Sequence, residues 1–416
     1  MMNSMAASHA RGKGGGTDKI FGVAAAANKA VQQFGRDKVT NATIGAILDD
    51  EEKLVVLPTV EKAWRAVPMT EIINYAPIAG LPEYLDAAIN LTFADNKPDA
   101  YIKAVATAGG SGVLHHVIWN YSEIGDTVLT SDWYWEPYDV LCGDALRKLE
   151  TFTLFDDTLK FNQQAFEAKV KSLLDKQNNL VILLNTPAHN PTGYSLTDAE
   201  WDRVLGFLKE CAANQSKRIV PLIDIAYLDY AGEKNAVRAF MKKLGGLPAN
   251  ILPILAFSMS KGYTMYGQRT GAMIGVSSSQ DIIQEFADIN SFTSRATWSN
   301  INRGCMRMVA MIMSDKAQQT AMEQERDIYY KLIQERAAIF TKEAQEVTLK
   351  MLPFVAGFFI TVPAGNPEGA CKKLQEDNIF AVPLGQGIRI AVCAVPRAKM
   401  PGMATKVAAA IASASK

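Results

Sequence analysis

The chain has 416 residues, and its 43 Lys and Arg balance 43 Asp and Glu, so no overall field attracts nucleic acid or an anionic membrane. Hydrophobic residues make up 48% and charged residues 21%, as in a folded globular protein and unlike a disordered one. Single cores stop growing at roughly 250 to 300 residues, so this length predicts a large domain with a smaller companion.

Residues 1–17 are rich in small residues and lack the apolar region of a secretory signal, so we expect a flexible leader, with a transit peptide as the alternative. No apolar run approaches the roughly 18 residues that span a bilayer. Five scattered cysteines, an odd number without C-x-x-C spacing, favour neither a disulfide framework nor a zinc site. A cytoplasmic protein without a membrane or nucleic-acid partner is the simplest expectation.

Taken in chain order, residues 19–34 have a helical pattern, and residues 41–53 resemble a strand that runs into a turn. Short apolar runs separated by helical patterns then recur at 126–129, 180–184, 218–223, 254–257 and 272–276. Strands that are apolar on every side and spaced by helices predict an α/β fold with a mostly parallel sheet between two helical layers.

The C-terminal third changes character. Residues 299–346 are helical almost without a break, and strand-like runs at 358–362 and 388–392 precede a closing helix. We therefore expect a large domain over 54–320 and a smaller α/β domain made of 18–53 and 321–416.

Polar side chains follow the predicted parallel strands where each strand ends, which is where ligands bind in open α/β sheets. They comprise one amide, one acid, one phenol, two hydroxyls and one lysine: Asn190, Asp224, Tyr227, Ser258, Ser260 and Lys261. Among neighbouring cations a lysine has its pKa lowered and can attack a carbonyl, so Lys261 is a candidate for a Schiff base. Its alternative is a lysine that snorkels or pairs with an acid.

Two further features are suited to a phosphate. Arg269 offers a rigid fork of donors, although a structural salt bridge is the alternative. The run A-T-A-G-G-S-G at 106–112 opens a predicted helix whose free N–H groups bind anions, but a plain glycine turn explains it equally well. No metal site is expected, because the four histidines form no ligand constellation.

Together these motifs resemble the fold type I pyridoxal-phosphate aminotransferases, in the branch of the aspartate and aromatic enzymes, from about residue 18 to the C-terminus. The pieces occur in the family's order: N-Y-A-P-I-A-G-L, G-G-S-G, A-H-N-P-T-G, D-I-A-Y, S-M-S-K with Y-G-Q-R-T-G, R-A-T-W-S-N and I-R-I-A-V. The resemblance implies a mostly parallel seven-stranded sheet in the large domain and pyridoxal 5′-phosphate as the cofactor.

The resemblance also implies roles. Lys261 would form the Schiff base and then move the substrate proton, Asp224 would hold the pyridine nitrogen protonated, and Asn190 with Tyr227 would bind the ring oxygen. The phosphate would be held by Gly110, Ser111, Ser258, Ser260 and Arg269, and by Tyr75 of a neighbouring subunit in a homodimer. Trp135 would stack on the ring, although the neighbouring Trp133 or Tyr134 could be the stacking residue instead.

On the substrate side, Arg389 matches the arginine that grips the α-carboxylate, and Arg295 the arginine that reads a side-chain carboxylate across the dimer. Ile44, Gly45 and Phe359 would line that pocket. The chain has Ile47 where the aspartate branch often has tyrosine. We expect transfer of an amino group from aspartate, or else from an aromatic amino acid, to a 2-oxo acid such as 2-oxoglutarate. A lyase on the same scaffold, carbon-sulfur or aminocyclopropane-carboxylate synthase-like, is the alternative.

Overall fold

The computed structural model describes residues 5–11, 13 and 19–414, which divide into two compact units. The larger unit comprises Lys53–Glu335 and Pro353–Phe358, and the smaller comprises the chain up to Glu52, Arg336–Leu352 and Phe359–Lys416. The second division therefore falls at Arg336 and not at 321. Helix α12 (Lys316–Glu346) runs through position 321 without a break, so the sequence carries no boundary signal there. Much of the expected leader lies outside the described residues; within it Ser8–Ala10 forms a 3-10 turn.

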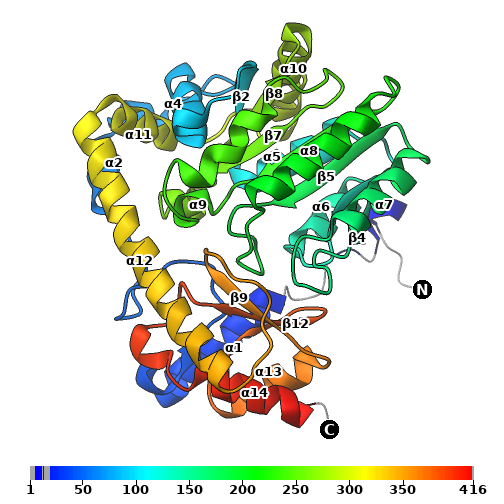
Figure 1. Ribbon diagram of the computed structural model, residues 1–416. Helices are drawn as coiled ribbons and strands as arrows, with labels where there is room; N and C mark the ends of the chain where they lie inside the picture. Colours follow the sequence, from blue (N-terminus) through cyan, green and yellow to red (C-terminus); the bar gives the residue numbers. More distant parts are fainter. Residues whose placement is uncertain (1–4, 12, 14–18, 415–416) are drawn as a thin grey trace. The chain divides into compact units, whose positions relative to one another are not determined.

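A seven-stranded sheet forms the centre of the larger unit (Figure 1). Its strands run parallel except β8, which is antiparallel to both of its neighbours, so the predicted mostly parallel sheet is confirmed. Across the sheet the strands are β2 (Tyr101–Thr107), β8 (Gly271–Ser277), β7 (Ile254–Ser258), β6 (Arg218–Asp224), β5 (Asn179–Asn185), β3 (Thr127–Ser131) and β4 (Lys148–Phe152).

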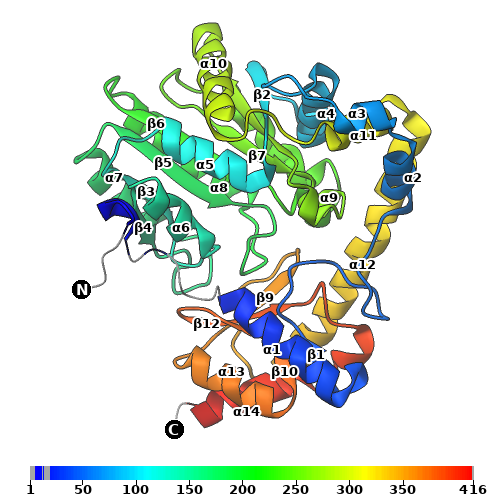
Figure 2. The ribbon, with the colours of Figure 1, turned by 180° about the vertical axis from the view of Figure 1, so that it is seen from behind.

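The central strands are buried along almost their whole length, which explains why each is apolar on both faces. Helix α8 (Asp198–Ala212) covers one face and α5 (Gly109–Asn120) covers the other, as Figures 1 and 2 show from opposite sides. A capping box begins α8: the side chains of Thr197 and Glu200 each accept a hydrogen bond from the other residue's backbone N–H.

The other helices of the larger unit surround this sheet: α2 (Pro58–Ala66), α3 (Met69–Ile73), α4 (Pro82–Phe93), α6 (Pro137–Asp144), α7 (Gln163–Leu174), α9 (Met259–Gly262), α10 (Gln280–Thr297) and α11 (Arg303–Ser314). The helical run expected over 299–346 is interrupted at Asp315. The Asp315 carboxylate accepts hydrogen bonds from the backbone N–H groups of Ala317 and Gln318, and so begins α12.

The smaller unit is an α/β unit whose three-stranded antiparallel sheet has the order β11-β12-β9. Its elements are α1 (Lys19–Phe34), β1 (Thr40–Asn41), β9 (Phe359–Pro363), α13 (Pro367–Glu376), β10 (Ile379–Phe380), β11 (Val382–Pro383), β12 (Gly387–Ala391) and α14 (Met403–Ala414). The strand expected at 41–53 is wrong beyond Asn41. The Asn41 side chain accepts hydrogen bonds from the N–H and hydroxyl of Thr43, and this turn ends the strand.

Within the described ranges, no helix is both long and apolar enough to cross a membrane. In the same part of the chain, no group of three or more His, Cys, Asp or Glu side chains could hold a metal ion.

Candidate active site

A hollow of about 150 Å³ opens in the larger unit where β5, β6 and β7 end. Side chains that the sequence places far apart meet there because parallel strands bring their carboxyl ends to one edge. Ten of the eleven residues predicted to bind the cofactor line it: Gly110, Ser111, Trp135, Asn190, Asp224, Tyr227, Ser258, Ser260, Lys261 and Arg269.

Lys261 is carried by α9, a single helical turn that directly follows β7. The Ser258 hydroxyl caps this turn by accepting a hydrogen bond from the Ser260 N–H at 3.2 Å. The Lys261 ammonium lies over the rings of Tyr227 and Tyr266, 5.5 and 5.9 Å from their centres. The cap and the strand end together fix where the lysine leaves the backbone.

Asp224 ends β6, is buried and lines the hollow. Burial raises the pKa of its carboxyl group, against the hydrogen bonds it accepts and the charge of Lys261, which lower it. One carboxylate oxygen accepts a hydrogen bond from the Tyr138 phenol at 2.9 Å, and the other accepts from the Ala226 N–H at 3.1 Å. A buried carboxylate of this kind is completed by a proton donor or a cation.

Sequence reasoning missed Tyr138, although it is only three residues after Trp135. Burial and the nearby Asp224 carboxylate hold the pKa of the Tyr138 phenol well above its ordinary value, so Tyr138 stays a hydrogen-bond donor at every working pH. Asn185 was missed as well. Its amide donates to the Asp224 carbonyl at 2.8 Å and accepts from the Asn190 N–H at 2.6 Å, which joins two strand ends.

Two predicted ligands of the cofactor ring lie side by side. The Asn190 amide donates a hydrogen bond to the Tyr227 phenol oxygen at 3.2 Å, and both residues are buried. Both therefore present polar groups to the same part of the hollow.

Arg269 brings together two hydroxyl groups of the lining. Its guanidinium donates to the Ser260 hydroxyl at 3.3 Å and to the Ser111 hydroxyl at 3.4 Å. Ser111 lies in the first turn of α5, a twelve-residue helix whose free N–H groups favour an anion. A cation, hydroxyls and a helix N-terminus therefore converge on one point.

The contacts of the three adjacent aromatic residues at 133–135 show which of them faces the hollow. Trp135 lines the hollow, whereas the Tyr134 phenol donates to the Asp139 carboxylate at 2.5 Å and Trp133 is buried. Trp135 also packs edge-on against Tyr138, with ring centres 5.7 Å apart. The geometry thus favours Trp135 as the residue that faces a flat ligand.

The smaller unit holds a second group of predicted residues. Arg389 on β12 is buried, donates to the Thr43 carbonyl at 3.1 Å and lies 4.3 Å from the centre of the Phe359 ring. Gly45 packs against the same ring, since a Cβ there would lie 2.9 Å from Phe359. The neighbouring Ile44 carbonyl accepts a weak hydrogen bond from the Cys393 thiol at 3.6 Å.

Tyr75 and Arg295 join neither group. Tyr75 is 83% exposed, and Arg295 is exposed with a hydrogen bond to the Ser299 hydroxyl. Both had been expected to act on a neighbouring subunit, which a single chain cannot display. Their roles stay predictions.

Comparison with known proteins agrees with this geometry. The family model for aminotransferase class I and II matches residues 37–407, which is most of the chain. The chain belongs to the class I and II aminotransferases. The resemblance inferred from the motifs is thereby confirmed, and the enzyme is an aminotransferase that uses pyridoxal phosphate.

Named relatives of this aminotransferase act on two kinds of substrate. Over 312 residues it is 26% identical to the cytoplasmic aspartate aminotransferase of Dictyostelium discoideum, a match that covers 72% of this chain and 67% of the relative. Over 341 residues it is 26% identical to the aromatic-amino-acid aminotransferase of Escherichia coli, covering 78% and 81%. Both relatives are named as aminotransferases, so the lyase alternative is not favoured.

Solved structures agree on the fold. An aminotransferase from Anaerococcus prevotii superimposes with a TM-score of 0.96 at 36% identity, covering 98% of this chain and 99% of the other. The aromatic-amino-acid aminotransferase of Burkholderia pseudomallei, described as covalently bound to pyridoxal phosphate, shares the fold with a TM-score of 0.77 at 21% identity, covering 98% and 100%. The fold type I prediction is therefore confirmed.

The residues of the hollow fit this cofactor. Gly109 has a positive φ of 69°, and a Cβ there would lie 2.7 Å from the Arg269 guanidinium, so the glycine keeps the anion cradle open. The buried Asp224 carboxylate of the same hollow matches a protonated ring nitrogen. A phosphate and a pyridinium at two ends of one flat molecule are what these two groups require.

Proposed function

We propose that the enzyme transfers the amino group of an L-amino acid to a 2-oxo acid through Lys261. The observation that supports this most is the gathering of Lys261, Asp224 and Arg269 around one hollow of the larger unit. A nucleophilic amine, a buried carboxylate and an anion cradle are the groups that pyridoxal phosphate needs from a protein.

Each residue has a separate task. Pyridoxal phosphate supplies an aldehyde for the amino group and a ring that withdraws electrons from the substrate Cα. Lys261 binds the cofactor through its Nζ and afterwards moves the proton at the substrate Cα. Asp224 keeps the ring nitrogen protonated, while Tyr227 and Asn190 donate hydrogen bonds to the ring oxygen.

The remaining predicted ligands hold the ends of the cofactor and the substrate. Trp135 covers the ring face. The phosphate is held by Gly110, Ser111, Ser258, Ser260 and Arg269. Arg389 binds the substrate α-carboxylate through two parallel hydrogen bonds, and Ile44, Gly45 and Phe359 form the wall beside it.

Aspartate is the proposed donor, with an aromatic amino acid as the second candidate and 2-oxoglutarate as the acceptor. The relatives' names divide between these two donors. Arg295 would bind a side-chain carboxylate of aspartate or glutamate, and its exposure in a single chain agrees with a role toward a second subunit.

A homodimer with shared sites and a cytoplasmic location complete the proposal. Exposed apolar side chains in and after α3, Met69 at 67%, Ile73 at 74% and Tyr75 at 83%, are suited to burial against a second copy. Sedimentation equilibrium of the holoenzyme should give twice the mass of one chain. A monomer that retains full activity would contradict the shared site.

The decisive experiment is a set of half-reactions. Holoenzyme is mixed with aspartate, glutamate, tyrosine, phenylalanine or alanine, and the absorbance of the lysine-bound cofactor is followed together with the 2-oxo acid product. We expect aspartate to convert the enzyme fastest. If no donor converts it, the aminotransferase proposal fails, and a product other than the corresponding 2-oxo acid would favour a lyase.

A further inference from the structure

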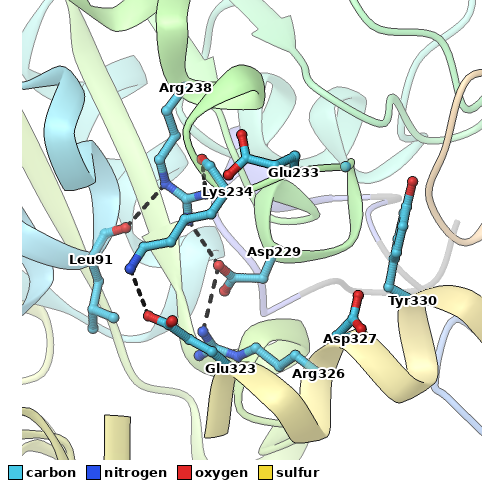
Figure 3. A pocket seen from close by; sticks show the side chains of 10 residues that line it. Leu91, Asp229, Glu233, Lys234, Arg238, Glu323, Arg326, Asp327 and Tyr330 are labelled. Atoms are coloured by element: carbon cyan, nitrogen blue, oxygen red, sulfur yellow. Dashed lines mark hydrogen bonds and ion pairs between the residues drawn. The ribbon is translucent and has the colours of Figure 1, made fainter. Parts of the chain in front are cut away.

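A buried ionic cluster lies directly beside the segment that carries Lys261. Figure 3 shows the Asp229 carboxylate between the guanidinium groups of Arg238 and Arg326, at the wall of a second hollow of the larger unit. The Arg238 guanidinium is 2.9 Å and that of Arg326 is 3.6 Å from the same carboxylate oxygen. Neither arginine lines the cofactor hollow, so neither is among the predicted cofactor ligands.

Two contacts lead from this cluster to the lysine. The Arg326 Nε donates a hydrogen bond at 2.6 Å to the carbonyl oxygen of Gly262, the residue after Lys261. Its guanidinium also lies 4.9 Å from the centre of the buried Tyr263 ring. Arg326 therefore holds the last residue of α9 and the residue that follows it.

Asp229 closes the same junction from the other side. A Cβ on Gly262 would collide with the Asp229 carboxylate, so this position has room only for glycine. Asp229 is two residues after Tyr227, in the short 3-10 helix Leu228–Tyr230. The pair Asp229 and Arg326 thus joins the segment of Tyr227 to the segment of Lys261.

The Asp229 carboxylate is paired with both arginines. Burial alone would raise the pKa of the Asp229 carboxyl, but the charges of Arg326 and Arg238 outweigh it and hold that pKa below its ordinary value. Arg238 also donates hydrogen bonds to the carbonyls of Leu91 and Lys234 (Figure 3). A further one is donated to the carbonyl of Thr92. Breaking a buried pair leaves an uncompensated charge, so the arrangement is rigid.

We propose that Arg326 and Asp229 are positioning residues that set the direction in which Lys261 leaves its backbone. This rests on the proposed role of Lys261. A displacement of about 1 Å at a reacting group can cost on the order of 10²-fold in rate, so a clamp on the adjacent peptide has a measurable effect.

The test measures how fast cofactor-free enzyme attaches pyridoxal phosphate to Lys261, by the absorbance of the lysine-bound cofactor. Arg326→Gln should slow attachment about tenfold or more, and Arg326→Lys should recover part of the rate. The matched control is Arg238→Gln, which removes the other arginine of Asp229 without touching α9. Attachment in this control should stay within about threefold of the wild type, even where its melting temperature falls.

Equal slowing in Arg326→Gln and Arg238→Gln, or normal attachment in Arg326→Gln, would overturn the proposal. If Arg326→Gln does not fold, Gly262→Ala tests the proposal instead. Its methyl group would displace the Asp229 carboxylate and should slow cofactor attachment to a similar degree. A wild-type rate of attachment in Gly262→Ala would overturn the proposal. Lys261→Ala distinguishes failure of the proposed function from failure of the positioning role. If Lys261→Ala still attaches the cofactor, the proposed function fails. If Lys261→Ala does not attach it but Arg326→Gln attaches it at the normal rate, only the positioning role fails.

Discussion

The larger and the smaller unit hold their predicted site residues in different ways. In the larger unit, side chains from several strand ends line one hollow, and ten of the eleven predicted cofactor ligands belong to that lining. In the smaller unit, Arg389 is a buried cation that lies against the Phe359 ring and donates to the Thr43 carbonyl. The predicted cofactor ligands are thus gathered in one compact unit, whereas the predicted substrate ligands are distributed between the two units.

The largest effect should come from the larger unit. In Asp224→Asn, the amide cannot hold a proton on the ring nitrogen, so the half-reaction with aspartate should slow by about 10³-fold or more. Stopped-flow absorbance measures this rate. Asp132→Asn is a suitable control, because the Asp132 carboxylate accepts from the Leu154 N–H and does not line the hollow. A loss of less than about tenfold in Asp224→Asn would show that Asp224 is not needed to keep the ring nitrogen protonated.

A second change tests the smaller unit. Arg389→Lys replaces a planar fork by a single ammonium and should raise the KM for every amino donor by roughly 10²-fold, with a smaller effect on kcat. Arg397→Gln, which removes a half-exposed partner of Asp50 in the same unit, should leave KM within about twofold. If both variants bind donors normally, Arg389 does not grip the α-carboxylate.

A third change asks whether substrate choice is separate from cofactor chemistry. Arg295→Ala should lower kcat/KM for aspartate and glutamate by about 10²-fold and for tyrosine and phenylalanine by less than about threefold, because only the former offer a side-chain carboxylate. The absorbance spectrum of the bound cofactor should not change. Equal losses for both groups of donors would exclude Arg295 from specificity.

The sequence predicted the larger unit better than the smaller for physical reasons. Buried strands are continuous apolar runs, so β5, β6, β7 and β8 were found within one or two residues. The polar residues at or after the ends of β5, β6 and β7 marked the hollow. The half-buried β4 lacks such a run and was missed. Asn41 and Asp315 each interrupt a predicted element by a local hydrogen bond of the side chain, which periodicity does not report.

Site residues followed the same division. Lys261, Asp224 and Asn190 stand at strand ends and were identified by position, while Tyr138 and Asn185 act through hydrogen bonds that only the folded chain reveals. Arg326 is 65 positions after Lys261 in the numbering and lies in a helix of mixed charge, so nothing in its neighbourhood distinguishes it. Residues that position others are therefore the hardest to predict from sequence.

The smallest effect concerns the pH dependence of the larger unit, and it is predicted for Tyr138→Phe. Burial raises the pKa of the Asp224 carboxyl, and the hydrogen bond from Tyr138 lowers it, so removing the phenol should raise that pKa further. Asp224 must be ionised to hold the ring nitrogen protonated, and activity is lost as the pH falls through its pKa. A hydrogen bond to a charged group contributes about 1.5 kcal/mol, so the acid limb of kcat should move upward by about one pH unit. Near the optimum, kcat should fall by less than about tenfold.

Tyr134→Phe provides a matched control on the same segment. The Tyr134 phenol also donates to a carboxylate, that of Asp139, but Tyr134 does not line the hollow. Its loss should therefore leave the acid limb where it is in the wild type, while the same single oxygen atom is removed. An upward movement in Tyr138→Phe alone assigns the acid limb to Asp224. If both variants move it equally, or neither does, the acid limb belongs to another group, and the hydrogen bond between Tyr138 and Asp224 has only a structural role.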